Sequence, residues 1–371
     1  MPTSTSSDPA DPAIPAAAAP AAISQLEAVL TRAWMRRGPL ACALWPLSLL
    51  FRAIASLRRL LYLRGVLPST RLPVPVIVVG NIFIGGTGKT PLTIWLAEAL
   101  LAAGFRPGVI SRGHGSSGST NALPRLVTPG ASAQQVGDEP LLIAQRSGCP
   151  VMVGRDRVAA GLALLQVHPE LDILIADDGL QHYALQRDIE IVLFDARAIG
   201  NGWLLPAGPL REGPTRRRDF TVINAPQLSP GLLAAVAPQG LAATQMQLAS
   251  EFAERLSNRG QRTALAVLAA STLRIVAAAG IGNPGRFFSM LAAHGVCFAE
   301  LALPDHHAFL DHPFVAIDAD IILITEKDAV KCAQIEELKD DPRLWVVPVS
   351  ARIDAALAQQ IVEKCRGCSL A

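Results

Sequence analysis

Val76-Ile-Val-Val-Gly-Asn-Ile-Phe-Ile-Gly-Gly-Thr-Gly-Lys-Thr90 is the stretch that decides the fold of this chain. It begins as a β-branched run, continues as a glycine-rich turn and ends where an apolar helical pattern starts. A strand, a glycine loop and a helix in this order form the phosphate cradle of P-loop nucleotide-binding proteins. The common spacing has glycine five residues before Gly88, where this chain has Phe83. The shorter core still supplies the backbone donors and predicts a nucleotide site.

The loop residues have distinct predicted roles within that site. Backbone N–H groups of a glycine loop point inward, and the positive end of the following helix faces the anion. We therefore expect the phosphates to be held by Gly85, Gly86, Thr87 and Gly88. Lys89 is predicted to reach the β- and γ-phosphates, and the Thr90 hydroxyl to hold Mg²⁺.

Short apolar strands alternate with helical patterns on both sides of this stretch. Strands are predicted at 74–79, 107–111, 150–153, 172–176, 189–194, 220–224, 274–279, 321–325 and 344–349, with helices between most of them. Strands interleaved with helices imply a mostly parallel sheet covered on both faces. The expected fold is α/β and P-loop NTPase-like, with a second, smaller α/β domain and an N-terminal amphipathic helix.

Composition and length divide the chain into four predicted segments. At 371 residues it can form two domains with their own cores. The expected segments are a disordered extension (1–23), an N-terminal membrane-associated helical segment (24–66), a P-loop domain (67–240) and a second α/β domain (241–371). Residues 226–261 form the least orderly stretch and are the predicted link. A net charge of +2 argues against a nucleic-acid partner.

The cysteines indicate reduced thiols. Six are scattered through the chain, which is typical of a cytosolic protein. Cys365-Arg-Gly-Cys368 is a lone CxxC pair without a second pair or a nearby histidine, so it is weak evidence for zinc.

The segment from Gly38 to Phe51 is free of charge and is flanked by arginines. Its 14 residues are too few for a membrane span. Continued as a helix, the segment gathers an apolar face and a polar face: Leu47, Leu50, Phe51, Ile54, Leu57 and Leu61 on the first, and Ser48, Arg52, Ser56 and Arg59 on the second. An apolar stripe with arginines and tryptophans favours a helix lying in a membrane interface. An amphipathic helix packed on the protein core is the alternative.

Two pairs of adjacent carboxylates are candidates for chemistry. Asp177 and Asp178 follow a buried strand, where an aspartate of P-loop proteins orients Mg²⁺ directly or through water. Gln181 and His182 follow this pair and favour a functional role over a plain Asp-Gly turn. Asp138 and Glu139 stand at a predicted helix start. Asp138 could be a simple N-cap, or the pair could bind metal or take a proton from an acceptor hydroxyl.

Two further clusters have open interpretations. Leu303-Pro-Asp-His-His-Ala-Phe-Leu-Asp-His312 is dense in histidine, with Asp305, His306, His307 and His312 as possible metal ligands. Its spacing matches no structural zinc pattern, and a histidine–carboxylate general base or a plain polar loop are the other interpretations. Arg211 and the run 216–218 would usually be solvated, although near a P-loop they could clamp phosphates.

Together these segments resemble one family, tetraacyldisaccharide 4′-kinase, the lipid A 4′-kinase of Gram-negative bacteria. The resemblance covers about Leu40 to Ser350 and rests on eight motifs in the family's order. They are Gly85-Gly-Thr-Gly-Lys-Thr-Pro91, Ser111-Arg-Gly113, Val136-Gly-Asp-Glu-Pro140, Asp177-Asp-Gly-Leu-Gln-His182, Leu205-Pro-Ala-Gly-Pro-Leu-Arg211, Gly280-Ile-Gly-Asn-Pro284, Pro304-Asp-His-His307 and Thr325-Glu-Lys-Asp328. Phe83 fits the looser loop of this family, and Gly285 stands where the family often has glutamate.

The resemblance implies transfer of the ATP γ-phosphate to the 4′-hydroxyl of a tetraacylated disaccharide 1-phosphate, with ATP and Mg²⁺ as cofactors. Segment 67–240 would be the kinase domain, facing the second domain across a cleft. The catalytic residues would be Asp138, His306 and Lys89, and the candidate Mg²⁺ ligands Thr90, Glu139, Asp177 and Asp178. The implied partners are the lipid disaccharide and the surface of the inner membrane at its cytoplasmic face. No protein partner is implied.

Two other functions compete with this expectation. One is a membrane-associated P-loop ATPase switch that shares the Gly-Gly-Thr-Gly-Lys-Thr core. Such switches carry an extra lysine where this chain has Ile84. The other is a nucleotide-gated adaptor for a membrane complex.

Overall fold

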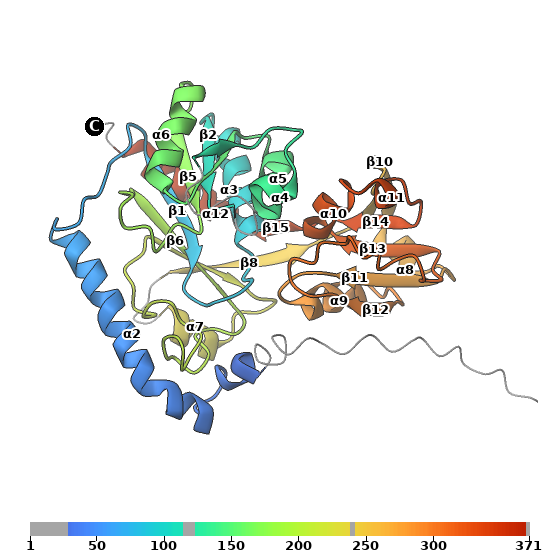
Figure 1. The fold of residues 1–371 in the computed structure, drawn as a ribbon, viewed down its shortest axis with the longest axis horizontal. Coiled ribbons are helices and arrows are strands. Elements are labelled where there is room, and N and C mark those ends of the chain that lie inside the picture. Colours follow the sequence, from blue (N-terminus) through green and yellow to red (C-terminus); the bar gives the residue numbers. More distant parts are fainter. Residues whose placement is uncertain (1–28, 114–122, 238–241, 369–371) are drawn as a thin grey trace, which may run out of the picture.

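The computed structural model describes residues 29–113, 123–237 and 242–368. Two lobes lie side by side, each built around its own sheet, and a long helix runs along the outside of the larger lobe (Figure 1). We call the lobe with the P-loop the first lobe and the other the second lobe. The predicted extension at residues 1–23 lies outside the described residues.

The first lobe contains a nine-stranded sheet among the described residues. Its spatial order is β15 (Ser350–Ile353), β8 (Ala243–Ala249), β7 (Phe220–Asn224), β6 (Ile189–Asp195), β1 (Val76–Asn81), β5 (Ile173–Asp177), β2 (Pro107–Ser111), β4 (Val151–Val153) and β3 (Arg125–Leu126). All neighbouring pairs are parallel except the two edges, β15 with β8 and β3 with β4. The predicted mostly parallel α/β sheet is confirmed.

The second lobe contains a six-stranded sheet among the described residues. Its order is β10 (Asn258–Ala264), β9 (Phe252–Arg255), β14 (Leu344–Val347), β13 (Ile321–Thr325), β11 (Ile275–Ala279) and β12 (Ala299–Ala302). The four strands from β14 to β12 are parallel, and β9 and β10 extend the sheet as an antiparallel hairpin. Helices α8 (Leu265–Ala269), α9 (Pro284–Ala293), α10 (Glu326–Cys332) and α11 (Glu336–Lys339) belong to this lobe.

Strand β1 shows why the first sheet is a central layer. All six of its residues are buried, and successive side chains enter different cores. Ile77 and Val79 pack with α3 (Lys89–Ala102), α5 (Asp138–Ser147) and α12 (Ala355–Arg366). Val76 and Val78 pack with α6 (Arg157–Val167) and α7 (Pro230–Val236) on the opposite face. A strand buried on both faces reads as a continuous apolar run, as β1 does.

The sheets do not divide at the predicted boundary between residues 240 and 241. Strands β8 and β15 belong to the first sheet, and α12 packs on α3. The second lobe is therefore inserted between β8 and β15 of the first. The stretch 226–261, expected to be a link, instead contains α7, β8, β9 and the start of β10. Polar residues in β8 and β10 hide their strand pattern, because β10 is largely exposed and β8 only half-buried.

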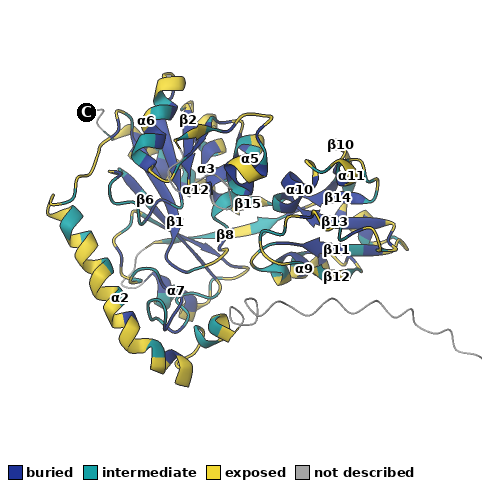
Figure 2. Ribbon diagram, viewed as in Figure 1, coloured by how far each residue is buried: buried dark blue, intermediate teal, exposed yellow. Residues whose placement is uncertain are grey.

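Helix α2 (Pro39–Leu63) is exposed along most of its length (Figure 2), and Ala41 and Ser48 are its buried residues. Ser48 is buried, donates a hydrogen bond of 2.6 Å to the Leu204 carbonyl and accepts one of 2.9 Å from the Ala207 N–H. Leu50 and Leu57, each 56% exposed, and Ile54, 59% exposed, are among the apolar side chains that point outward. The alternative of an apolar face packed on the core is therefore wrong.

The length of α2 also differs from the sequence-based estimate. The helix has 25 residues, and only 11% of its most apolar window is buried. By length and composition it could cross a membrane, so the argument from the shorter uncharged stretch does not apply to the whole helix.

Candidate active site

The P-loop has the backbone that its glycines predict. Gly85 and Gly88 have φ values of 95° and 101°, in the left-handed region that disfavours side chains. At Gly88 a Cβ atom would also lie 2.6 Å from Nδ2 of Asn224, which donates a 2.8 Å hydrogen bond to the Thr87 carbonyl. The Thr87 hydroxyl oxygen is buried and has no hydrogen-bond partner in the described part of the chain. The hydrogen bond from Asn224 therefore supports the backbone of the loop. The Thr87 hydroxyl is left as an unsatisfied polar group within the loop.

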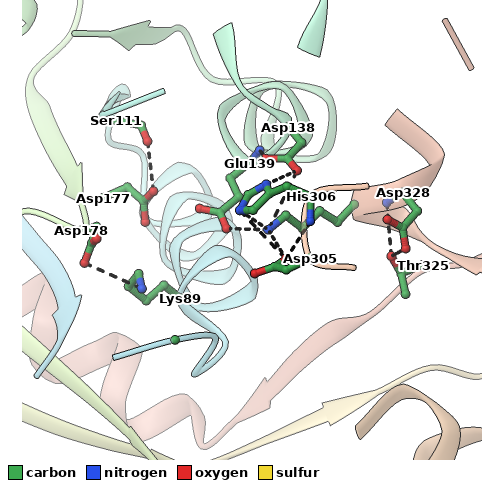
Figure 3. Close-up of polar contacts among 12 residues, drawn as sticks. Lys89, Ser111, Asp138, Glu139, Asp177, Asp178, Asp305, His306, Thr325 and Asp328 are labelled. Carbon is green, nitrogen blue, oxygen red and sulfur yellow. Dashed lines mark hydrogen bonds and ion pairs between the residues drawn. The ribbon is translucent and has the colours of Figure 1, made fainter. Parts of the chain in front are cut away.

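Lys89, the first residue of α3, lies between the P-loop and the carboxylates. Its Nζ donates a 3.1 Å hydrogen bond to Oδ1 of Asn81 and lies 3.7 Å from Oδ1 of Asp178 (Figure 3). Phe83, which replaces the expected glycine, is buried beneath the guanidinium of Arg197, 4.2 Å from the ring centroid. Phe83 therefore belongs to the core beneath the loop. It does not displace the backbone N–H donors of residues 85–90.

Asp177 and Asp178 stand at the carboxyl end of β5 in different surroundings. Asp177 is 2% exposed and accepts hydrogen bonds from Thr93 Oγ1 at 3.2 Å and Ser111 Oγ at 3.1 Å. Burial, together with the charges of Glu139 and Asp178, raises the pKa of Asp177 to about 6.

Asp178 is held by cations and by an unusual backbone conformation. Its φ of 48° is left-handed, and Arg211 Nη1 contacts both of its oxygens at 3.2 and 3.3 Å. Burial alone would raise the pKa of Asp178, but Lys89 and Arg211 outweigh it and hold the pKa below its ordinary value. Asp178 is therefore the more acidic member of the pair.

Asp138 and His306 meet across the two lobes. Asp138 opens α5 in the first lobe, and His306 follows β12 in the second, with a left-handed φ of 59°. His306 Nδ1 lies 3.0 Å from Asp138 Oδ2 (Figure 3). Asp138 Oδ1 accepts the N–H of Glu139 at 2.9 Å. The hydrogen bond to Asp138 raises the pKa of His306, against the opposing effects of burial and of Lys327.

Two lysines of α10 surround this pair. Lys327 Nζ lies 3.5 Å from His306 Nε2, 3.1 Å from Glu139 Oε1 and 3.9 Å from Asp138 Oδ2. Lys331 Nζ lies 3.8 Å from Asp138 Oδ2 and 3.6 Å from Oδ1 of buried Asp328. Burial alone would raise the pKa of Asp138, but the His306 hydrogen bond and the two lysines lower it overall. Asp138 is therefore kept as an anion facing the imidazole.

The described residues contain no group of three or more His, Cys, Asp or Glu side chains arranged to hold a metal. This is compatible with Mg²⁺, which usually takes one or two carboxylates and completes its shell with phosphate oxygens and water. Burial, and after it the charges of Glu139 and Asp178, raise the pKa of Asp177, so both carboxylates act on it electrostatically. Carboxylate oxygens are hard donors of the kind that Mg²⁺ takes.

The other sequence candidates separate into those near the site and those that are structural. His307 pairs with exposed Asp311 at 3.3 Å, and its Nδ1 accepts the Phe309 N–H. Arg216 is buried and forms ion pairs with Glu190 and Glu212, so it is not the solvated arginine that its run suggested. The metal-site interpretation of the histidine loop gains no support among the described residues.

A cavity of about 410 Å³ lies between α2 and the segment 202–216. Trp45, Arg52 and Arg59 line it from the helix, and Arg211 and Glu212 from the opposite side. Gln181 Nε2 donates to Glu212 Oε1 at 2.9 Å. Burial and nearby arginines lower the pKa of His182 to about 4, so its ring is neutral near pH 7. Arg211 therefore both lines the cavity and binds Asp178 at the carboxyl end of β5.

Several residues of the site had no role in the sequence-based prediction. Lys327, Lys331 and Asp328 lie in or just after the quoted Thr325-Glu-Lys-Asp328 motif, and the i, i+4 spacing of the lysines on one helix face was a usable signal. Arg157 is 1% exposed and donates to the Asp177 carbonyl at 3.2 Å. Nothing in the local sequence marks an arginine as buried.

Comparison with known proteins gives a consistent result. A model of the tetraacyldisaccharide-1-P 4′-kinase family matches residues 40–366. The chain is 59% identical over 352 residues to the tetraacyldisaccharide 4′-kinase of Janthinobacterium sp. (strain Marseille), covering 94% of this chain and 99% of that protein. It is 46% identical over 329 residues to that of Bordetella parapertussis, covering 88% and 93%. A crystal structure of LpxK from Aquifex aeolicus in complex with ATP is similar with a TM-score of 0.70 and 29% identity, covering 88% of this chain and 99% of that one.

Proposed function

Since this chain belongs to the tetraacyldisaccharide-1-P 4′-kinase family, we propose that Asp138 and His306 activate the acceptor hydroxyl while residues 85–90 hold ATP. The chain is a kinase of lipid A biosynthesis that transfers phosphate to the 4′-hydroxyl of the lipid disaccharide. Family membership sets aside the ATPase switch and the adaptor. The proposal concerns which residues perform the transfer and where the lipid lies.

On the donor side, the P-loop and Lys89 position the triphosphate. Phosphoryl transfer depends mainly on positioning and on neutralising charge at the transferred group. The backbone N–H groups of the loop and the Lys89 ammonium supply that neutralisation. The hydrogen bond from Lys89 to Asn81 and its proximity to Asp178 hold the ammonium at the mouth of the loop. The bound ATP of the structurally similar Aquifex kinase supports this assignment.

Mg²⁺ would be held by Thr90, which follows Lys89 in the first turn of α3, together with Glu139 and either Asp177 or Asp178. When bound, it supplies positive charge to the phosphate oxygens. Asp178 is the better first ligand of the aspartate pair because its side chain is 27% exposed and its pKa is lowered, whereas Asp177 is buried and accepts hydrogen bonds from Thr93 and Ser111.

On the acceptor side, the single observation that carries the proposal is the 3.0 Å contact between Asp138 and His306. Asp138 fixes the proton on Nδ1, so that Nε2 is the nitrogen that accepts the proton of the 4′-hydroxyl. As the imidazolium forms, the negative charge of Asp138 stabilises it. Because the two residues come from different lobes, the base is complete only when the lobes are together.

The lipid substrate is proposed to approach along α2. The outward leucines and Ile54 of this helix form an apolar surface suited to the membrane interface, at the cytoplasmic face of the inner membrane. The cavity beside the helix leads toward Arg211 and Asp178. A disaccharide 1-phosphate in this cavity would keep its acyl chains in the bilayer and its sugar near the site.

One assay tests the proposal. ATP labelled at the γ-phosphate is incubated with the protein, Mg²⁺ and tetraacyldisaccharide 1-phosphate in detergent micelles, and the label is followed. We expect label on the lipid with the wild type, and a loss of at least about 10²-fold with His306→Ala. Label released only to water, or near-normal transfer by His306→Ala, would contradict the assignment. Deleting residues 1–66 tests the anchor separately, because continued sedimentation with membranes would place the anchor elsewhere.

A further inference from the structure

Arg286 is a residue of the second lobe that reaches the P-loop region of the first. It lies in the first turn of α9, and its Nη2 is 3.2 Å from Oδ2 of Asp195, the last residue of β6. Strand β6 is hydrogen-bonded to β1, which leads directly into the P-loop. The contact therefore joins the second lobe to the strand ends beside the nucleotide site.

Asp195 does not need Arg286 to balance its charge. The carboxylate is fully buried and already accepts from Arg197, with Nε at 3.1 and 3.0 Å from the two oxygens and Nη2 at 2.7 Å from Oδ2. The backbone N–H of Arg197 adds a bond of 3.0 Å. One aspartate thus faces two arginines, and the group carries a surplus positive charge.

This surplus charge lies against the phosphate loop. Arg197 Nη2 donates to the Gly86 carbonyl at 3.3 Å, and its Nη1 is 3.8 Å from the position a Cβ would take at Gly85. Arg286 shares the same Asp195 oxygen as Arg197 Nη2. Two arginines gathered on one carboxylate beside a glycine loop present donors for a polyphosphate.

The segment from Gly280 to Arg286 connects this group to the acceptor side. Gly280 accepts the His306 N–H at 3.2 Å and donates its own N–H to Asp328 Oδ2 at 2.9 Å. The Gly280-Ile-Gly-Asn-Pro284 motif therefore begins beside the proposed base, and Arg286 follows it beside the P-loop. A movement that brings His306 to the acceptor also brings Arg286 toward the donor.

We propose that Arg286 binds the terminal phosphate of the P-loop nucleotide, with Asp195 holding its guanidinium at the loop in the absence of that anion. The inference rests on the proposed nucleotide site. The Arg286–Asp195 contact is not needed to hold the lobes together electrostatically, since Arg286 is 34% exposed and buried Asp195 is already neutralised by Arg197. As a phosphate ligand delivered by the second lobe, it would stabilise charge on the transferred group, as arginine fingers do.

The test compares two nucleotides in the full-length protein. Equilibrium binding of a non-hydrolysable ATP analogue and of ADP, both with Mg²⁺ in detergent micelles, is measured for the wild type, Arg286→Ala and Arg286→Lys. We expect Arg286→Ala to weaken the ATP analogue at least about tenfold and ADP less than about twofold, because only the analogue carries a γ-phosphate. Turnover should fall on the order of 10²–10³-fold, the cost of removing one donor that stabilises charge in the transition state. Arg286→Lys should have an affinity for the ATP analogue between those of the wild type and Arg286→Ala. If the alanine variant does not fold, the comparison of the two nucleotides is made with the lysine variant.

Arg274→Ala is the matched control, because Arg274 also forms ion pairs in the second lobe, with Asp318 and Asp320, but precedes β11 at the opposite end of that strand from Gly280. It should leave both affinities unchanged. Equal losses for the two nucleotides with Arg286→Ala, or no loss, would overturn the inference. If instead the wild type binds neither nucleotide, or Lys89→Ala does not weaken the analogue, the nucleotide site itself is wrongly assigned.

Discussion

Replacing Asp138 by asparagine is the most direct test of the mechanism. The side chain keeps its size and position at the start of α5, but it loses the negative charge that faces His306 at 3.0 Å. The new amide group can donate to Nδ1 of His306. The ring would then carry its proton on Nε2, the nitrogen that is required to accept one.

The expected loss follows from this change of tautomer. General base catalysis contributes about 10²–10⁴-fold, and an Asp→Asn change that imposes the wrong histidine tautomer in a catalytic triad costs about 10⁴-fold. Asp138 is 4% exposed, so water cannot substitute for its carboxylate. We therefore expect Asp138→Asn to lower kcat about 10³–10⁴-fold, which corresponds to about 4–5.5 kcal/mol in the barrier.

The assay is transfer of labelled γ-phosphate to the lipid disaccharide in detergent micelles, accompanied by binding of a non-hydrolysable ATP analogue. Binding should stay within about threefold of the wild type, because Asp138 is not part of the phosphate cradle. Asp311→Asn is the matched control. Asp311 also faces a histidine, His307 at 3.3 Å, but it is 65% exposed, and turnover should change by no more than about twofold.

Two results would refute the reasoning. If Asp138→Asn keeps turnover within about tenfold of the wild type, the carboxylate does not set the state of the base. If analogue binding falls in proportion to turnover, Asp138 acts on the nucleotide and not on the acceptor.

Three further predictions follow from the same geometry. The hydrogen bond to Asp138 raises the pKa of His306 above 6.5, and only the neutral ring can accept a proton. Consequently kcat/KM should increase with pH, with an apparent pKa above 6.5. An apparent pKa at or below 6.5 would contradict the assignment of His306 as the base. Thr90→Val should raise the Mg²⁺ concentration for half-maximal turnover at least about tenfold, measured by Mg²⁺ titration, whereas an unchanged midpoint would exclude the hydroxyl as a ligand. Ile54→Glu with Leu57→Glu should lower partitioning onto vesicles at least about tenfold in a sedimentation assay, since each apolar side chain is worth about 1.5–3 kcal/mol when buried. Leu162→Glu, on an exposed position of α6, should leave partitioning unchanged.

Local sequence patterns predicted the individual helices and strands well. They predicted much less well which strands, distant in the chain, pair within a sheet. The strand 220–224 was predicted with the bounds that β7 has, because an apolar run between turn signals is a local property. The pairing of β15 with β8 in the first sheet joins residues more than 100 positions apart in the chain, such as Arg352 and Gln247. No periodicity within either strand contains that information.

The site shows the same division. The phosphate cradle could be predicted from consecutive residues, since the loop and its helix are contiguous. The Asp138–His306 pair came from the family resemblance, because the two residues are 168 positions apart and belong to different lobes. Lys331 was missed for a different reason. A lysine in a short helix is usually exposed, whereas this one is 8% exposed between Asp138 and Asp328.

The insertion of the second lobe between β8 and β15 has a consequence for how the protein is made. Helix α3, which follows the P-loop, packs against β15 and α12, and both are synthesised after the whole second lobe. A nascent chain therefore carries the complete nucleotide loop long before the helix behind it is covered. The second lobe, whose strands all lie between residues 252 and 347, emerges as a whole before that happens. Synthesis of the first lobe thus begins before that of the second lobe and is completed after it. A chain truncated near residue 349 should keep the inserted lobe intact, while the kinase lobe should be sensitive to proteolysis.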